Sequence, residues 1–361
     1  MPFCSRPILA HLLAACGALA AASLPATAGP ALLVEAESGR VLYADGQDNE
    51  WFPASLTKIM TAYLTFDALK NGRLKLTDEV AVSELAHAQV PSKLGLPVGT
   101  AITVDAAIHA VVIKSANDAA IMLAEKIGGS QAAFVQLMND TAKRLGMTRT
   151  HFVNPNGLPV PGQVSTARDL ATLTRAVLQD FPERNALWGM SEFQLGKQKL
   201  RSHNGLLRKF EGADGIKTGF ICDSGFNVVA SATRDGMRLI AVVLGEPSGK
   251  DRNLRAASLL EHGFETSAWK AQLGAPTLDG LPMDAHAQPV QSVRTSVTAW
   301  ACNPRAPARK VTRRKPRGTV QRTKAGVQKG GERRRPGNGQ KSAATSTPLP
   351  VLRGSLQPSS Q

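Results

Sequence analysis

The chain has 361 residues, of which 43% are hydrophobic, an ordinary share for a globular protein that buries a core. The net charge of +15 is uneven, because residues 301–361 hold 15 lysines and arginines against a single acid, Glu332. The excess of positive charge therefore belongs to this tail, and it excludes no class of function for residues 1–300. The seven histidines are scattered without an H-x-x-x-H pair, so we predict no metal site and no cofactor.

The first 28 residues are typical of an export signal. Arg6 precedes an almost wholly small or apolar run, 8–24, and a small-x-small cleavage sequence ends at Ala28. The run is short and Pro25 follows it, which disfavours a retained membrane helix. A lipoprotein-like box ending at Cys16 is a minor alternative, because apolar residues follow that cysteine. We expect an exported, periplasmic protein whose signal is cleaved near Ala28.

The first predicted elements are a β-hairpin over residues 30–45 and a buried helix from Ser55 to about Asn71. On that helix Ser55 and Lys58 would share one face, one turn apart. Partial burial would lower the pKa of the Lys58 amine and let it take a proton from the Ser55 hydroxyl. Taken alone, the pair also fits an ordinary helix start with a solvated lysine.

The next feature is a polar break between two buried helices. Residues 106–113 are apolar nearly all round, which predicts a buried helix capped by Thr103 or Asp105. It stops at Lys114-Ser115-Ala116-Asn117, and a second apolar helix begins at Asp118. Buried polar groups are costly unless they are hydrogen-bonded or face a cleft, so this break indicates a cleft or a plain helix connection.

The second half of the chain changes from helices to strands. Two further helices are predicted at 131–145 and, after a cap at Thr166, at 167–178. Short links predict an antiparallel meander of three strands, near 215–220, 226–232 and 237–244. A last helix, 254–263, would pack on this sheet. The pattern fades beyond about Trp269, and residues 301–361 have too few large apolar side chains to offset the entropy of ordering them.

Three short motifs now stand in chain order: Ser55-x-x-Lys58, Ser115-Ala116-Asn117 and Lys217-Thr218-Gly219. The set resembles the motif trio of penicillin-binding proteins and class A β-lactamases. More narrowly, over roughly residues 30–266 the chain resembles the low-molecular-mass D-alanyl-D-alanine carboxypeptidases of peptidase family S11. The resemblance implies an α/β (α+β) fold of the β-lactamase/DD-peptidase type, with an antiparallel sheet flanked by helices and an all-helical subdomain.

The resemblance also divides the chain and assigns roles to residues. It implies a DD-peptidase catalytic domain at 29–268, while the export pattern and the composition predict a signal peptide at 1–28 and a linker with a disordered basic tail at 269–361. Ser55 resembles the acylated nucleophile, Lys58 the general base, and Ser115 the group that relays a proton to the leaving amine. Substrate binding is implied for Asn117, Lys217, Thr218, Gly219, Phe220 and Arg252, with the backbone N–H groups of Ser55 and Phe220 as oxyanion donors.

The chain departs from the family pattern in places. Phe220 and Ile221 follow the third motif where a polar or aromatic residue and then threonine are common, and His203 falls near an arginine of some relatives. Many larger relatives carry a C-terminal β-rich domain and an amphipathic anchoring helix, and we expect neither here. After export only Cys222 and Cys302 remain, either as a disulfide or as buried thiols.

The favoured function is a serine D-Ala-D-Ala carboxypeptidase that acts on peptidoglycan pentapeptide stems, with β-lactam antibiotics as covalent inhibitors. A DD-endopeptidase acting on cross-links and a class A-like β-lactamase are the alternatives among enzymes. The non-enzymatic alternative is an envelope-binding protein that uses the basic tail. For residues 301–361 we weigh a solvated extension and attachment to envelope polyanions, and we expect no nucleic-acid binding because the chain is exported.

Overall fold

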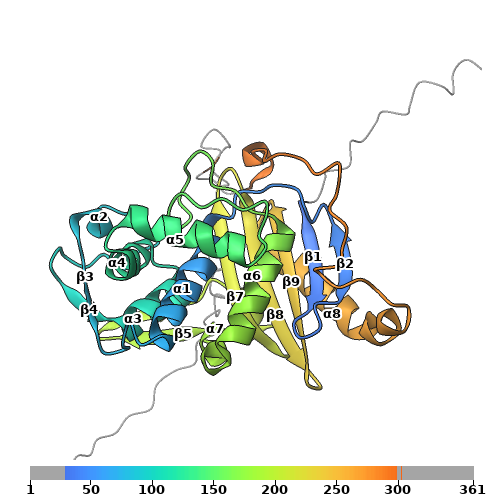
Figure 1. Ribbon diagram of the computed structural model, residues 1–361, viewed down its shortest axis with the longest axis horizontal. Coiled ribbons are helices and arrows are strands. Elements are labelled where there is room, and N and C mark those ends of the chain that lie inside the picture. Colours follow the sequence, from blue (N-terminus) through green and yellow to red (C-terminus); the bar gives the residue numbers. More distant parts are fainter. Residues whose placement is uncertain (1–28, 299–301, 303–361) are drawn as a thin grey trace, which may run out of the picture. The chain divides into compact units, whose positions relative to one another are not determined.

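The computed structural model describes residues 29–298 and Cys302, so the predicted export signal, the Cys16 alternative and the basic tail lie outside the described residues. Its centre is a five-stranded antiparallel sheet with the strand order β2-β1-β9-β8-β7 (Figure 1). The strands are β1 (Ala31–Glu35), β2 (Val41–Asp45), β7 (Ala213–Ile221), β8 (Gly225–Arg234) and β9 (Met237–Glu246). The predicted hairpin and meander are confirmed, and they meet where β1 pairs with β9.

The central strands are apolar on both faces, because successive side chains enter two different cores. In β9, Ile240 and Val242 belong to the larger core, while Leu239 and Ala241 belong to the smaller one. Helix α6 (Ala167–Asp180) covers the first face and α8 (Gly249–Gln272) the second (Figure 1). The sheet is thus a central layer between helices, as the resemblance implied.

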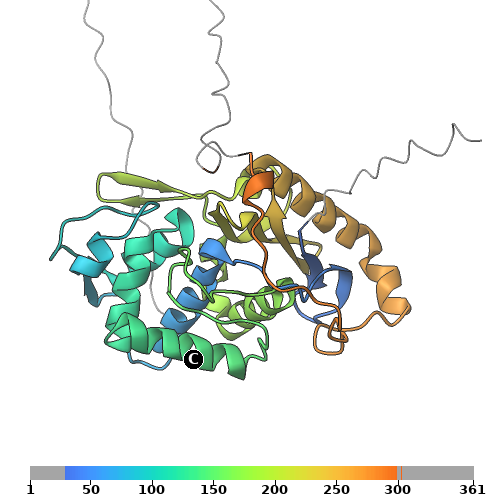
Figure 2. The ribbon, with the colours of Figure 1, turned by 90° about the horizontal axis from the view of Figure 1, so that it is seen from above.

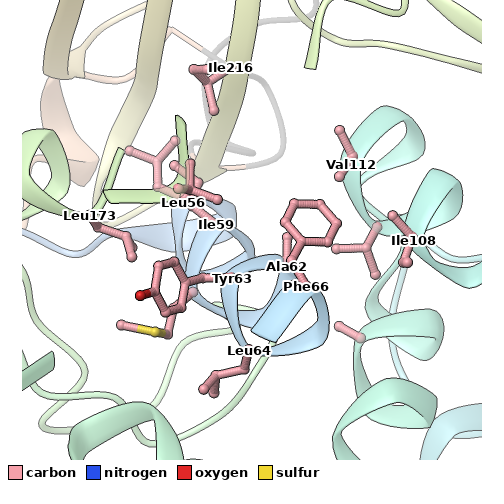
Figure 3. Close-up of a cluster of buried hydrophobic side chains, with 14 of the residues drawn as sticks. Leu56, Ile59, Ala62, Tyr63, Leu64, Phe66, Ile108, Val112, Leu173 and Ile216 are labelled. Carbon is pink, nitrogen blue, oxygen red and sulfur yellow. The ribbon is translucent and has the colours of Figure 1, made fainter. Parts of the chain in front are cut away.

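The remaining helices gather beside the sheet around α1 (Lys58–Lys70). They are α2 (Glu84–His87), α3 (Val104–His109), the π-helical turn η2 (Ala110–Lys114), α4 (Asn117–Gly128), α5 (Gln131–Arg144) and α7 (Asn185–Trp188). Figure 3 shows why α1 is central: Phe66 points towards Ile108 and Val112, whereas Tyr63 points towards Leu173. A helix that is apolar all round can be stable only when other elements enclose it.

Short elements complete this part of the chain. The 3₁₀ turns are η1 (Ala54–Thr57), η3 (Pro182–Arg184), η4 (Gly205–Arg208) and η5 (Arg294–Ser296). Two small hairpins pair β3 (Glu79–Ala81) with β4 (Ala101–Thr103) and β5 (Glu192–Leu195) with β6 (Gln198–Arg201). The β5–β6 hairpin was not predicted, because its strands are short and largely exposed and carry little hydrophobic pattern.

The last helix is longer than its predicted range of 254–263. The Ser248 side chain accepts from the Asp251 amide, so α8 begins at Gly249. Gly263 does not end the helix: a Cβ there would lie 2.7 Å from Leu239 and 2.8 Å from Leu33, so this glycine lets α8 lie close to the sheet. The sequence shows a helix-ending residue, whereas the structure uses it for close packing.

The segment after α8, which we expected to be linker, returns across the body. Arg168 donates to the main-chain carbonyls of Leu278, Leu281 and Pro282, and its guanidinium also pairs with the buried carboxylate of Asp48. Residues 277–284 are therefore fixed to α6 by one buried arginine. Within the described residues, no helix is both long enough and apolar enough to cross a membrane.

Candidate active site

Ser55 lies in η1, immediately before α1 begins, and Lys58 follows at the first position of α1. The Lys58 Nζ atom is 3.0 Å from Ser55 Oγ, so the predicted pair is in contact. Ala54, next to the serine, has a φ of +48°, a left-handed conformation that costs energy for any residue with a side chain. This sharp turn presents Ser55 at the surface of a pocket while Lys58 stays inside.

Lys58 is 1% exposed, and its Nζ also donates to the Asn117 side-chain oxygen at 2.7 Å and to the Asn156 carbonyl at 2.5 Å. Burial, and next the positive charge of Lys217, hold the pKa of the Lys58 ammonium well below its usual value. A neutral amine has two N–H donors and one lone pair. The two carbonyl oxygens take the donors, which leaves the lone pair for the Ser55 hydroxyl.

The second motif lies opposite this pair, at the break that the sequence predicted. Ser115 ends η2 with a φ of +62° and is one of the residues that line the pocket. Asn117 is the first residue of α4, and both ends of its side-chain amide are hydrogen-bonded. The oxygen accepts from Lys58, and the nitrogen donates to the Val90 carbonyl at 2.8 Å. Asn117 therefore holds the lysine and the loop at Val90 in place, in addition to lining the pocket.

The third motif lies on β7, the edge strand, which runs directly beside η1. An added Cβ at Gly219 would be 2.9 Å from the Pro53 carbonyl oxygen and 3.2 Å from the Ser55 nitrogen. Only a glycine permits this approach. The Asn227 side chain on β8 donates to the Phe52 carbonyl at 2.9 Å, which fixes the chain just before Ser55 to the same sheet.

Two buried cations lie at this end of the site. Lys217 is 3% exposed, and burial followed by the charge of Arg252 lowers its pKa to about 7. Arg252 on α8 is 6% exposed, and burial lowers its pKa to about 10. Among the described residues neither makes a salt bridge to a carboxylate; Lys217 contacts the Thr218 carbonyl and Arg252 the Asn253 side chain. Buried cations without an anionic partner favour an anionic ligand.

A pocket of about 410 Å³ joins these pieces. Of the predicted residues, Ser55, Ser115, Asn117, Thr218, Gly219, Phe220 and Arg252 line it, while Lys58 and Lys217 lie behind the wall. None of the described lining residues is an aspartate or glutamate. In residues 29–298 no cluster of three or more His, Cys, Asp or Glu side chains could hold a metal ion.

Sequence reasoning missed the role of Asn156, whose main-chain oxygen contacts Lys58, since a carbonyl leaves no mark in a sequence. His203 was noted only as a departure, yet it lines the pocket. Burial, followed by the charges of Lys217, Lys114 and Arg252, lowers the His203 pKa. A single histidine before Asn204 and Gly205 matches no sequence motif, so the sequence does not indicate that His203 lines the pocket.

Of the two states left open by the sequence for Cys222 and Cys302, the structure shows the disulfide. It ties the turn between β7 and β8 to the C-terminal segment, directly beyond the pocket residues Phe220 and Ile221. The Phe220 ring stacks on that of Phe226 at 4.2 Å between centroids, so one wall of the pocket is aromatic.

Comparisons with known proteins agree with this geometry. The S11 peptidase profile, described as D-alanyl-D-alanine carboxypeptidase, matches residues 18–248. D-alanyl-D-alanine carboxypeptidase DacC of Escherichia coli is 42% identical over 64% of this chain and 60% of its own length. Penicillin-binding protein 5 of Haemophilus influenzae is similar in structure, with a TM-score of 0.64, 39% identity, and coverage of 66% of this chain and 71% of that one.

A further structural relative is penicillin-binding protein D2 of Listeria monocytogenes, solved in its ampicillin-bound form. It matches with a TM-score of 0.61 and 33% identity, over 66% of this chain and 97% of that chain. The chain spans only about 60% of the length of the first curated relatives it matches. The similarity therefore concerns only the aligned part of those relatives, about 60% of their length.

Proposed function

The chain belongs to the S11 family of D-alanyl-D-alanine carboxypeptidases, and from this membership we propose that it removes the terminal D-alanine from peptidoglycan stem peptides through an acyl-Ser55 intermediate. The observation that carries the proposal is a buried lysine with a lowered pKa in contact with Ser55, next to two buried cations that lack a carboxylate partner among the described residues. The first pair suits amide cleavage, and the cations suit a substrate that ends in a free carboxylate.

Acylation begins when the Lys58 amine takes the proton of the Ser55 hydroxyl and the oxygen attacks the carbonyl between the two D-alanines. The backbone N–H groups of Ser55 and Phe220 stabilise the oxyanion. Loss of one such donor typically lowers the rate by about 100- to 1,000-fold. Ser115 passes the proton to the leaving amine, and free D-alanine departs. Water then attacks the ester and regenerates Ser55.

Substrate binding is assigned to the remaining predicted residues. Lys217 and Arg252 bind the terminal carboxylate, with Thr218 beside them, and Gly219 lets β7 lie along the substrate backbone. Asn117 supports the site from the other side through its contact with Lys58. Phe220 forms the aromatic wall against which the substrate packs.

The same serine is proposed to react with β-lactam antibiotics, as the ampicillin-bound relative suggests. Class A β-lactamases deacylate rapidly with the help of a glutamate and a water. Here the described lining residues include no carboxylate, and Glu183 lines a separate cavity with Phe66 and Leu187. A long-lived penicillin adduct is therefore expected, and a carboxypeptidase is favoured over a β-lactamase.

The domain division and cellular location remain part of the proposal. Residues 1–28 serve as a cleaved export signal, 29–268 as the catalytic domain, and the enzyme works in the periplasm. For the tail, with its 15 lysines and arginines between residues 301 and 361, the two proposals are a solvated extension and attachment to envelope polyanions. Release from cell-envelope fractions by salt tests this attachment, and retention that salt does not change would contradict it.

The direct test is D-alanine release from a peptide that ends in D-Ala-D-Ala, compared with release from a cross-linked dimer. The wild-type chain should release D-alanine, and Ser55→Ala should not. Cleavage of the dimer with no D-alanine release would identify an endopeptidase instead. If neither substrate is cleaved and no penicillin adduct forms, the envelope-binding alternative gains support.

A further inference from the structure

A short C-terminal segment lies against the rim of the active site. We call residues 292–298 together with Cys302 the strap; it contains η5, the short orange helix at the top of Figure 1 and near the upper middle of Figure 2, where the orange segment ends. The Val293 amide donates to the Asp223 carbonyl at 3.0 Å, and the Arg294 guanidinium pairs with the Asp223 carboxylate at 2.8 Å. The Cys222–Cys302 disulfide adds a covalent link to the same turn.

The strap also holds a second segment, the loop between β9 and α8. Both the amide and the hydroxyl of Thr298 donate to the Pro247 carbonyl, each at 3.0 Å. Pro247 precedes Ser248, the residue that caps α8. One face of the strap is therefore fixed to the β7–β8 turn and the other to the start of α8.

These two segments supply one complete wall of the pocket. Phe220, Ile221 and Phe226 come from the ends of β7 and β8 that flank the turn, and Gly249 and Arg252 come from the first turns of α8. No described strap residue lines the pocket itself. Ser55, Lys58 and Ser115 lie on other elements, and no backbone hydrogen bond joins the described strap residues to those elements.

We propose that the strap is a positioning element for the carboxylate-binding wall, and that the Cys222–Cys302 disulfide is the latch that keeps Phe220 and Arg252 in register with each other. The proposal rests on the proposed function, because the wall matters only if a substrate carboxylate binds there. The disulfide joins positions 80 residues apart and is covalent, so it limits the movement of the strap away from the β7–β8 turn. The Arg294–Asp223 ion pair is exposed and contributes far less to this restraint.

Opening the latch needs a reductant, for which a small dithiol serves. The Cys222–Cys302 bond accepts two electrons and two protons and becomes two thiols, while the dithiol is oxidised to its own disulfide. Cys222 is only partly buried, so its sulfur offers a point of attack, whereas Cys302 is 6% exposed. Reduction should loosen the wall and leave the nucleophile and its base unchanged.

The test measures kcat and KM for D-alanine release by the full chain, oxidised or reduced, and by a double variant, Cys222→Ser with Cys302→Ser. The double variant and the reduced wild type should both show KM raised by about three- to tenfold with little change in kcat, the pattern of lost binding that is equal in ground and transition states. The dithiol should have no effect on the double variant. Unchanged KM in a folded double variant, or a loss confined to kcat, would overturn the proposal.

A matched pair of single variants covers the case in which the double variant does not fold. Arg294→Ala breaks an ion pair with side chains 50% and 29% exposed, and Arg73→Ala breaks the pair with Asp67, at 53% and 33%, on the helical side. With the disulfide reduced, Arg294→Ala should raise KM above that of reduced wild type, and Arg73→Ala should not. Equal effects would reject the strap's role. A wild-type chain that neither releases D-alanine nor reacts with penicillin overturns the proposed function and this role with it, whereas an active chain with unchanged variants overturns only the role.

Discussion

The contact between β7 and η1 allows a sharp prediction for Gly219→Ala. The new Cβ would lie 2.9 Å from the Pro53 oxygen, 3.2 Å from the Ser55 nitrogen and 3.3 Å from the Ala54 Cβ. Ordinary contacts begin near 3.4 Å, so β7 and η1 must separate by roughly 0.5 Å. Two of these three neighbours are backbone atoms, which cannot turn aside as a flexible side chain does.

The expected cost follows from that displacement. A misplacement of about 1 Å near a reacting centre can cost roughly 100-fold in rate, so half of it should cost about tenfold. Overpacking should also destabilise the fold by about 1–3 kcal/mol. The assays are the second-order rate constant for acylation by a penicillin and the melting temperature. Gly280→Ala is the control, because its nearest neighbour, the Thr277 hydroxyl, is 3.4 Å away. A folded Gly219→Ala variant that acylates at the wild-type rate would refute the argument that β7 sets the position of Ser55.

Three further predictions concern buried charges. Lys58→Met should keep the fold, as circular dichroism would show, but lower the acylation rate by about 100- to 10,000-fold because the general base is gone; near-normal acylation would exclude Lys58 as the base. In the proposed reaction Lys217 binds the substrate carboxylate only in its charged form, so kcat/KM for the D-Ala-D-Ala peptide should fall as pH rises through about 7. A pH profile of Lys217→Gln should lack this alkaline limb, and its persistence would assign the limb to another group. Arg168→Met should reduce the free energy of unfolding by about 3–5 kcal/mol in urea titrations, because it leaves the buried Asp48 carboxylate unpaired; a second change, Asp48→Asn, should restore part of the loss.

Much of the site could be predicted because its chemistry is carried by side chains in short motifs. The helix that begins near Ser55, the break at Ser115 and the strand at Lys217 leave clear marks, namely apolar periodicity, a polar interruption and a change of period. Their convergence on one pocket could be inferred only from the resemblance. The contacts from Lys58 to Asn117 and to Asn156 span 59 and 98 residues, and no local pattern encodes such distances.

Other features escaped prediction for physical reasons. The Asn156 carbonyl that contacts Lys58 belongs to the backbone, which is the same for every residue type. Gly263 has the appearance of a helix end, but it serves close packing of α8 on the sheet. The residues after α8 lack a hydrophobic pattern, yet they are held by the buried Arg168, by one ion pair and by a disulfide, none of which needs periodicity.

The central claim is that Ser55 is the acyl acceptor, and intact-protein mass spectrometry tests it most directly. The full chain is incubated with a penicillin, its mass is measured, and the adduct is located by peptide mapping, with Ser55→Ala treated in parallel. The account predicts a single adduct on the peptide that contains Ser55 and none on the variant. A wild-type chain that stays unmodified, or an adduct that persists on Ser55→Ala, would contradict it.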